Sequence, residues 1–384
     1  MHQTHCKPIR FALSGIFLLL FCQSPQVVEI ADKHILDDII TSEYKRLQLP
    51  GLAYAAVRND TILYIGAKGY ADRKKEIPFT TKTRITIAST SKTFVATAIM
   101  QLYEKGLLQL DDDVNSHIPF TIKNPYCPDE TITIKMLLTH TSSICERNYT
   151  EVAYYLYGYV DYPESVMSFS RNFLTENGDY YSDENYYNKQ PGTYFAYSNI
   201  GAGLLACIVE YITGITFNEY CKLNIFEPLG MTRTTWFYSE TPKSEVAIPY
   251  GENYDIDPDN PFYTYPTYPD GHLTTTVEDL SRFLRAYIND GTFNGFQLLK
   301  SSTLDLIFKE YCECRAIPAD QQGLLFHAKE TGNRKVWGHA GGDLGEVSSM
   351  YFDRERHTGY IMMNNLTTGR SEIIETALLN YADN

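Results

Sequence analysis

The chain has 384 residues, of which 43% are hydrophobic and 21% are charged, and its net charge is −14 at pH 7. This composition is typical of a globular protein with one large domain or two coupled ones, and it excludes a disordered or membrane-embedded chain. The acidic excess argues against nucleic acid and anionic membrane surfaces as partners.

Residues 1–26 have the pattern of a secretory signal peptide. Lys7 and Arg10 precede a mostly apolar run, residues 11–22, that is too short to span a bilayer. We therefore expect an exported protein, periplasmic or extracellular, whose mature part has no stable membrane span. Two alternatives stay open: lipidation of Cys22, which the bulky residue before it disfavours, and retention of the segment as a buried helix.

Six cysteines follow this leader, and the sequence cannot choose among their possible pairings. A disulfide between Cys127 and Cys145 is a guess. Cys207 lies in an apolar helical run and is expected to be a buried thiol. Cys312 and Cys314 have no matching Cys or His pair at the spacing of a zinc site, so we expect no metal.

Strand-like segments lie at both ends of the chain, and helices lie between them. Residues 52–58 and 62–66 alternate like two strands around a turn. The further expected helices are 134–138, 201–213, 277–288 and 371–381, and the further expected strands are 335–339, 346–352 and 359–364. This order predicts an α/β (α+β) architecture: a sheet built from about 27–85 and 271–384, with a helical region inserted at about 86–270.

Two segments, Tyr149–Tyr187 and Tyr250–Tyr268, are crowded with tyrosine. The simpler interpretation is that amphipathic rings pack these loops over the domain. The alternative is that the rings form walls of a substrate cleft, because aromatic faces bind sugar or peptide groups.

The most informative motif is Ser89-Thr90-Ser91-Lys92. Its serine and lysine are three apart at the start of a predicted helix, which ends near Gly106, so both side chains share one face. Unpaired N–H groups at the helix N-terminus favour negative charge near Ser89. The Lys92 amine can take the hydroxyl proton, so the motif predicts a nucleophilic serine.

Ser42 and Lys45 match the same spacing, which shows how weak the motif is alone. They fall in a predicted surface helix without glycine-rich or strand context. We therefore interpret Ser42 as a solvent-exposed residue of that helix.

A second motif, Tyr197-Ser198-Asn199, can supply a proton acceptor and an amide. A tyrosine beside a lysine ammonium can relay a proton, because the positive charge stabilises a phenolate. Asn199 can donate to and accept from a substrate amide. The same spacing recurs at 186–188 and 287–289, in a polar loop and inside a predicted helix, and a packed loop aromatic is the alternative for Tyr197 alone.

A third segment, Trp337–Gly342, brings adjacent glycines to the end of a predicted strand. Glycines let a strand edge approach a ligand closely and leave backbone N–H groups free. One such N–H, with that of Ser89, would form an oxyanion hole. Taken alone, the segment is better interpreted as a glycine-rich hairpin turn with a structural histidine.

Together these motifs resemble the penicillin-recognising serine hydrolases: class C β-lactamases, DD-carboxypeptidases, D-aminopeptidases and related esterases. The resemblance covers about residues 49–365, including Leu137–Ser142, Phe226–Met231 and Gly271–Leu280. It implies an antiparallel sheet flanked by helices, with an all-helical subdomain and the active site between them.

Carried over by position, the resemblance implies that Ser89 is acylated and that Lys92 and Tyr197 share the general-base work. It also implies that Asn199, His339 and Gly341 bind the substrate and that the Gly342 N–H completes the oxyanion hole.

The resemblance has departures that bear on the reaction. His339 stands where β-lactamases often have a lysine that helps hold a carboxylate, so strong β-lactamase activity is not expected. No glutamate lies at a spacing that suggests the class A deacylation route.

We therefore expect a cofactor-independent serine hydrolase for a small-molecule or peptide substrate. Its expected activity is that of a peptidase or amidase on D-amino acid peptides, or of an esterase. The alternative is a non-catalytic or penicillin-binding sensor or scaffold of the same fold. The oligomeric state is left open.

Overall fold

A nine-stranded antiparallel sheet forms the centre of the protein. The computed structural model describes residues 32–152, 155–252, 256–257, 259–313, 321–331 and 334–384. The strands of the sheet, in spatial order, are β10 (Cys312–Glu313), β11 (Gln321–Gln322), β12 (His327–Thr331), β13 (Arg334–Asp343), β14 (Glu346–Asp353), β15 (Thr358–Asn364), β1 (Gly51–Arg58), β2 (Thr61–Asp72) and β3 (Ile77–Pro78). Strands from both ends of the chain meet where β15 pairs with β1, as the sequence predicts.

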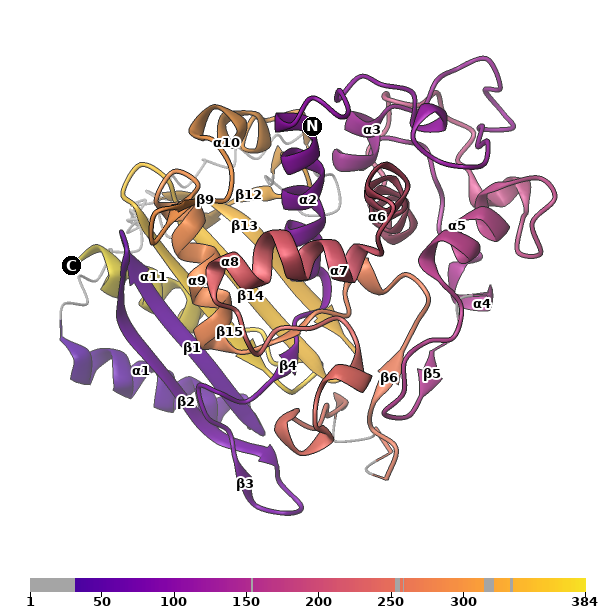
Figure 1. Ribbon diagram of the computed structural model, residues 1–384. Coiled ribbons are helices and arrows are strands. Elements are labelled where there is room, and N and C mark those ends of the chain that lie inside the picture. The colour runs from indigo at the N-terminus through magenta and orange to yellow at the C-terminus, as the bar shows by residue number, and fades with distance from the viewer. Residues whose placement is uncertain (1–31, 153–154, 253–255, 258, 314–320, 332–333) are drawn as a thin grey trace, which may run out of the picture.

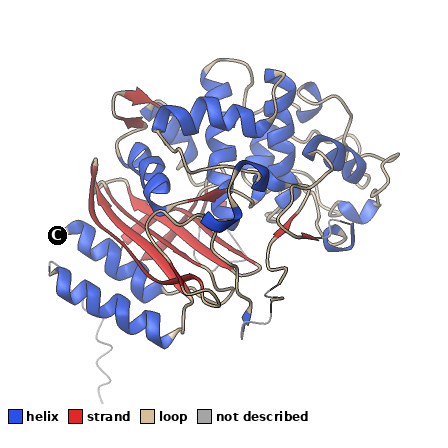
Figure 2. Ribbon diagram, turned by 60° about the horizontal axis from the view of Figure 1, so that its bottom comes forward, coloured by secondary structure: helices blue, strands red, loops and turns tan. Residues whose placement is uncertain are grey.

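Helices cover both faces of this sheet, in three layers (Figures 1 and 2). One face is packed by α1 (Lys33–Arg46) and α11 (Glu372–Asp383), and the other by α9 (Val277–Ile288) and the helical region. Successive side chains of a strand point to opposite faces. In β1, residues 52, 54 and 56 accordingly join one buried core, and residues 53, 55 and 57 join the other.

Most of the other helices gather in one region beside the sheet (Figure 1). They are α2 (Lys92–Glu104), α3 (Ile134–Leu138), α4 (Tyr149–Val152), α5 (Val166–Leu174), α6 (Asn199–Thr213), α7 (Phe217–Cys221), α8 (Glu227–Leu229) and, nearer the sheet edge, α10 (Ser301–Ile307). Short strand pairs accompany them: β4 (Ile85–Thr86) with β7 (Thr274–Thr275), β5 (Leu156–Tyr157) with β6 (Tyr263–Thr264), and β8 (Thr292–Phe293) with β9 (Phe296–Gln297). The β4–β7 pair places the two ends of the predicted insertion, near residues 86 and 270, side by side.

Helix α6 carries the second motif into the protein interior. The Ser198 hydroxyl accepts a hydrogen bond from the Gly201 N–H at 2.9 Å and so caps the first turn. The helix ends at Gly214, whose φ of +72° suits a residue without Cβ. Among the residues described, no single helix is long and apolar enough to cross a membrane. Helix α6 and residues 217–229 together are long and apolar enough, but they are bent by 79° where they meet.

The two tyrosine-rich segments pack against each other. They pair through β5 and β6, and the rings of Tyr155 and Tyr263 lie edge to face with centroids 5.0 Å apart. Tyr263 and Tyr265 are buried, whereas Tyr157 is exposed. The packing interpretation therefore accounts for the buried rings.

The cysteine expectations have different outcomes. Cys127 and Cys145 are both free thiols, so the guessed disulfide is wrong. Cys207 is buried, which confirms the expected buried thiol, and burial raises the pKa of that thiol. The predicted leader and Cys314 lie outside the described residues.

Candidate active site

Ser89 lies in a tight turn at the edge of the sheet. The turn is a 3₁₀ segment, Ala88–Ser91, that continues directly into α2 at Lys92. The sequence predicts Ser89 at the start of the α-helix, whereas in the structure Ser89 lies just before it. The Thr90 hydroxyl contacts Ser348 Oγ on β14 at 2.8 Å and donates to the His339 carbonyl on β13 at 3.3 Å. These bonds fix the turn to the sheet, and with it the Ser89 side chain.

Lys92 is fully buried and occupies the centre of the site. Its Nζ lies 3.2 Å from Ser89 Oγ, 2.7 Å from Asn199 Oδ1 and 2.7 Å from the backbone carbonyl oxygen of Asp270. Burial by itself lowers the pKa of this amine. The negative charges available at Tyr197, Asp270 and Glu146 outweigh burial and raise the Lys92 pKa above its ordinary value.

Tyr197 lies at the mouth of the site. Its side chain is 38% exposed, and the centroid of its ring lies 5.0 Å from Lys92 Nζ. The ring contacts His140 on one side, with centroids 4.5 Å apart, and faces His339 at 6.3 Å. The phenol is thus placed between bulk water and the buried ammonium, where it can pass a proton in either direction.

Glu146 belongs to the site, although no motif in the sequence indicated it. Its Oε2 accepts from Asn199 Nδ2 at 3.1 Å, and its Oε1 accepts from the backbone N–H of Ile200 at 2.7 Å. Because the amide nitrogen of Asn199 donates to this carboxylate, the amide oxygen of Asn199 points toward Lys92. Burial raises the pKa of Glu146 to about 7.

The third segment lies directly against the serine turn. A Cβ built on Gly341 would lie 3.0 Å from the Ser89 nitrogen, whereas a Cβ on Gly342 would meet nothing within 4 Å. Strand β12 pairs with β13 only as far as Gly338, so within the described chain one backbone edge of residues 339–343 has no strand partner. The Ser89 N–H and this open edge therefore border the same space, as an oxyanion hole requires.

His339 is buried beside β12 and is neutral. Burial and the neighbouring charges of His327 and Lys92 hold the pKa of its ring well below the ordinary value. Its Nδ1 contacts the carbonyl oxygen of Ala340 at 2.6 Å, and its ring lies 4.9 Å from that of His327. A neutral imidazole offers no positive charge to a substrate carboxylate, unlike the lysine of typical β-lactamases.

Asp270 is a second site residue that the motifs did not indicate. It ends a 3₁₀ turn, Tyr268–Asp270, and is buried at 5% exposure. Its carboxylate Oδ1 lies 3.8 Å from Lys92 Nζ. Its one sequence signal is its place beside Gly271–Leu280, a segment that already contributed to the family resemblance.

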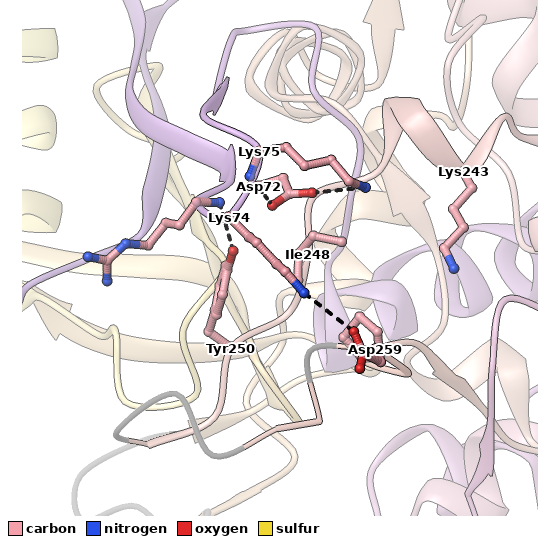
Figure 3. Close-up of a pocket in the computed structure, with 9 residues that line it drawn as sticks. Asp72, Lys74, Lys75, Lys243, Ile248, Tyr250 and Asp259 are labelled. Carbon is pink, nitrogen blue, oxygen red and sulfur yellow. Dashed lines mark hydrogen bonds and ion pairs between the residues drawn. The ribbon is translucent and has the colours of Figure 1, made fainter.

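A separate hollow of about 650 Å³ lies between the β2–β3 turn and residues 243–261 (Figure 3). Two of the four cations that line it pair with acidic neighbours: Lys74 with Asp259 at 3.5 Å, and Lys75 with Asp72 at 3.3 Å. The hollow shares no lining residue with the Ser89 centre.

Comparison with known protein sequences finds distant relatives, one of which is a putative penicillin-binding protein. The chain is 28% identical to Protein flp of Staphylococcus aureus over 259 residues, 66% of this chain and 48% of that protein. It is 29% identical to the putative penicillin-binding protein PbpX of Bacillus subtilis over 252 residues, 65% of this chain and 58% of that protein. The chain thus spans about half the length of the curated relatives it matches.

Solved structures share the fold at lower identity. D-amino acid amidase from Ochrobactrum anthropi SV3 superposes with a TM-score of 0.72 at 20% identity, covering 91% of this chain and 96% of that one. A penicillin-binding protein homologue from Pyrococcus abyssi has a TM-score of 0.69 at 24% identity, covering 91% and 76%. The expected fold is confirmed. The family model described as Beta-lactamase matches residues 36–382, and the chain therefore belongs to the Beta-lactamase family.

Proposed function

We propose that the protein is an exported serine hydrolase that cleaves an amide or ester bond through an acyl-serine intermediate. The observation that carries this proposal is the position of Lys92 Nζ, 3.2 Å from Ser89 Oγ and 2.7 Å from Asn199 Oδ1. This arrangement combines a nucleophile, the Ser89 hydroxyl, with a buried lysine and an open strand edge. These are the groups that an acyl-transfer site requires. The predicted leader, residues 1–26, supports export.

In the proposed reaction, Ser89 Oγ attacks the substrate carbonyl carbon, and the pair Lys92 and Tyr197 accepts the hydroxyl proton. The backbone N–H groups of Ser89 and Gly342 stabilise the oxyanion of the tetrahedral intermediate. Collapse breaks the bond to the amine or alcohol, which leaves with the proton. Water then attacks the acyl-enzyme by the same steps and releases the acid. Asn199 positions the substrate.

We favour an amidase or peptidase activity toward D-amino acid peptides, or an esterase activity, over strong β-lactamase activity. The neutral state of His339 removes the charge that would hold a β-lactam carboxylate. Structures that share the fold include the D-amino acid amidase and EstCE1, a hydrolase with promiscuous acyltransferase activity, which has a TM-score of 0.69 at 16% identity and covers 91% of this chain and 99% of that one.

The test is intact-mass analysis after treatment with a fluorophosphonate and with a β-lactam. We expect one adduct that Ser89→Ala abolishes and that Ser42→Ala leaves intact, because Ser42 is the exposed serine of the chance motif. A β-lactam adduct that turns over supports an enzyme. A permanent β-lactam adduct together with no turnover of any amide or ester would indicate a sensor, and no adduct with either reagent would indicate a scaffold.

A panel of substrates then separates the remaining classes. It contains D-Ala-D-Ala peptides, D-amino acid amides, short acyl esters and a chromogenic cephalosporin. We expect turnover of an amide or ester and little hydrolysis of the cephalosporin.

A further inference from the structure

Asp270 contacts Lys92 twice, through its backbone and through its side chain. The carbonyl oxygen of Asp270 accepts a hydrogen bond from Nζ at 2.7 Å, and Oδ1 lies 3.8 Å from the same nitrogen. Its other carboxylate oxygen, Oδ2, is buried and has no hydrogen-bond partner within the described part of the chain. The side chain is therefore held beside the amine by burial and charge, with no structural hydrogen bond to Oδ2.

Besides Lys92, the hydroxyl groups of Thr267 and Tyr265 hydrogen-bond to the Asp270 side chain and favour its charged form. The charged and titratable groups that face it are Lys92 from α2, Asp343 from β13, Glu146, Tyr149, Tyr155 and Tyr265. Asp343 and Glu146 are themselves acidic. In the residues that the structure describes, the one ion pair that Asp270 makes is with Lys92. Lys92 is thus the main electrostatic partner of Asp270, and Asp270 is, after Tyr197, the second charge that favours the ammonium of Lys92.

Hydrogen bonding alone permits two protonation states of Lys92. A neutral amine could donate to Asn199 Oδ1 and to the Asp270 carbonyl and accept from the Ser89 hydroxyl, which would make Lys92 the base. An ammonium could donate to all three. A carboxylate within 4 Å in a buried site favours the charged form and so decides between them.

We propose that Asp270 is a positioning residue that keeps Lys92 an ammonium during acylation, so that Tyr197 accepts the Ser89 proton. This inference rests on the proposed function and assigns the base within it. Two further observations agree with it. The pKa of Lys92 is raised despite complete burial, and Tyr197 connects that ammonium to solvent.

The experiment compares the rate of Ser89 modification by a fluorophosphonate between pH 5 and 10 in the wild type, Asp270→Asn and Asp270→Glu. Asparagine has nearly the shape of aspartate and keeps the backbone carbonyl, so it removes the charge with little change of shape and replaces one carboxylate oxygen by an NH₂ donor. If the phenolate of Tyr197 needs the ammonium, the rate should fall at high pH where Lys92 loses its proton. We expect this decline to begin at least about one pH unit lower in Asp270→Asn, with a lower rate at neutral pH. Asp270→Glu should restore the wild-type profile in part.

Glu346→Gln is the matched control. It removes a buried carboxyl group, whose pKa burial raises well above the ordinary value. This group contacts the Tyr263 hydroxyl at 2.7 Å and makes no ion pair with Lys92 in the described chain, so the profile of the variant should follow the wild type. Thermal melting checks that each variant is folded. Asp270→Ala, which also keeps the carbonyl, replaces the asparagine variant if that protein does not fold.

The outcomes separate this inference from the proposed function. If Asp270→Asn reacts with an unchanged pH profile, or reacts faster at neutral pH because a neutral Lys92 is the base, the assignment of Asp270 is overturned and the serine hydrolase stands. If wild-type Ser89 does not react at all, the proposed function fails and the inference fails with it.

Discussion

Replacing Gly341 by alanine tests whether the close approach of β13 to the serine turn builds the site. The new Cβ would lie 2.2 Å from the Ile87 carbonyl oxygen, 2.7 Å from Ser348 Oγ and 3.0 Å from the Ser89 nitrogen. Since a backbone oxygen cannot rotate away, the strand must retreat from the turn by about 1 Å. A displacement of this size costs about 100-fold in rate. Loss of an oxyanion donor costs about 100- to 1,000-fold.

Gly342→Ala is the control for this substitution, because its Cβ meets nothing within 4 Å and its N–H is kept. Turnover of the best substrate from the panel and fluorophosphonate labelling measure activity, and urea unfolding measures stability. We expect Gly341→Ala to lose at least about 100-fold in turnover and about 1–3 kcal/mol in stability. Gly342→Ala should lose far less of both. Equal activity of the two variants would refute the proposed contact between strand and turn.

Three further predictions concern Tyr197, His327 and the free cysteines. Tyr197→Phe should lower the rate of Ser89 labelling by about 100-fold or more and leave the melting temperature unchanged, because the ring is partly exposed; unaltered labelling would remove Tyr197 from the reaction. Burial lowers the pKa of His327 to about 3, so its contribution to stability is complete above the unfolded-state pKa of about 6.5 and is lost as pH falls toward 3. Between pH 6 and 4 the wild type should therefore lose about 1.4 kcal/mol per pH unit more than His327→Gln in urea unfolding, and parallel curves would contradict this. Dithiothreitol should not change the melting temperature, because Cys127 and Cys145 are free; a fall would show a disulfide.

Regular elements were predictable where side-chain burial is periodic. The helix expected at 277–288 has those bounds in the structure, because its apolar residues recur at helical spacing and it packs on the sheet. The strands expected at 346–352 and 359–364 lie within β14 and β15, which are buried on both faces and therefore appear in the sequence as short runs rich in apolar residues. The short β5–β6 pair escaped prediction, since two residues per strand carry no periodic pattern.

The site was predictable only where side chains follow a local motif. Ser89 and Lys92 are three residues apart, so one turn of chain brings them together whatever the rest of the fold does. Asp270 meets Lys92 across 178 residues through a backbone carbonyl, which any residue type could supply. Glu146 meets Asn199 across 53 residues from an irregular loop. Contacts of this kind depend on tertiary packing, which the sequence alone does not fix.

The distribution of charge in the buried centre explains why one lysine can remain charged where the histidines do not. Lys92 and His339 both lose water on burial, which penalises their cations alike. Lys92 gains three hydrogen-bond acceptors and a carboxylate at 3.8 Å, whereas the Nδ1 of His339 contacts a single backbone oxygen and its ring faces another histidine. The positive charge of the site is therefore on Lys92, beside Ser89, and not on His339, the residue of β13 that would face a substrate carboxylate. For this reason, substituting His339 with lysine should improve binding of carboxylate-bearing substrates only if a new acceptor compensates for its burial.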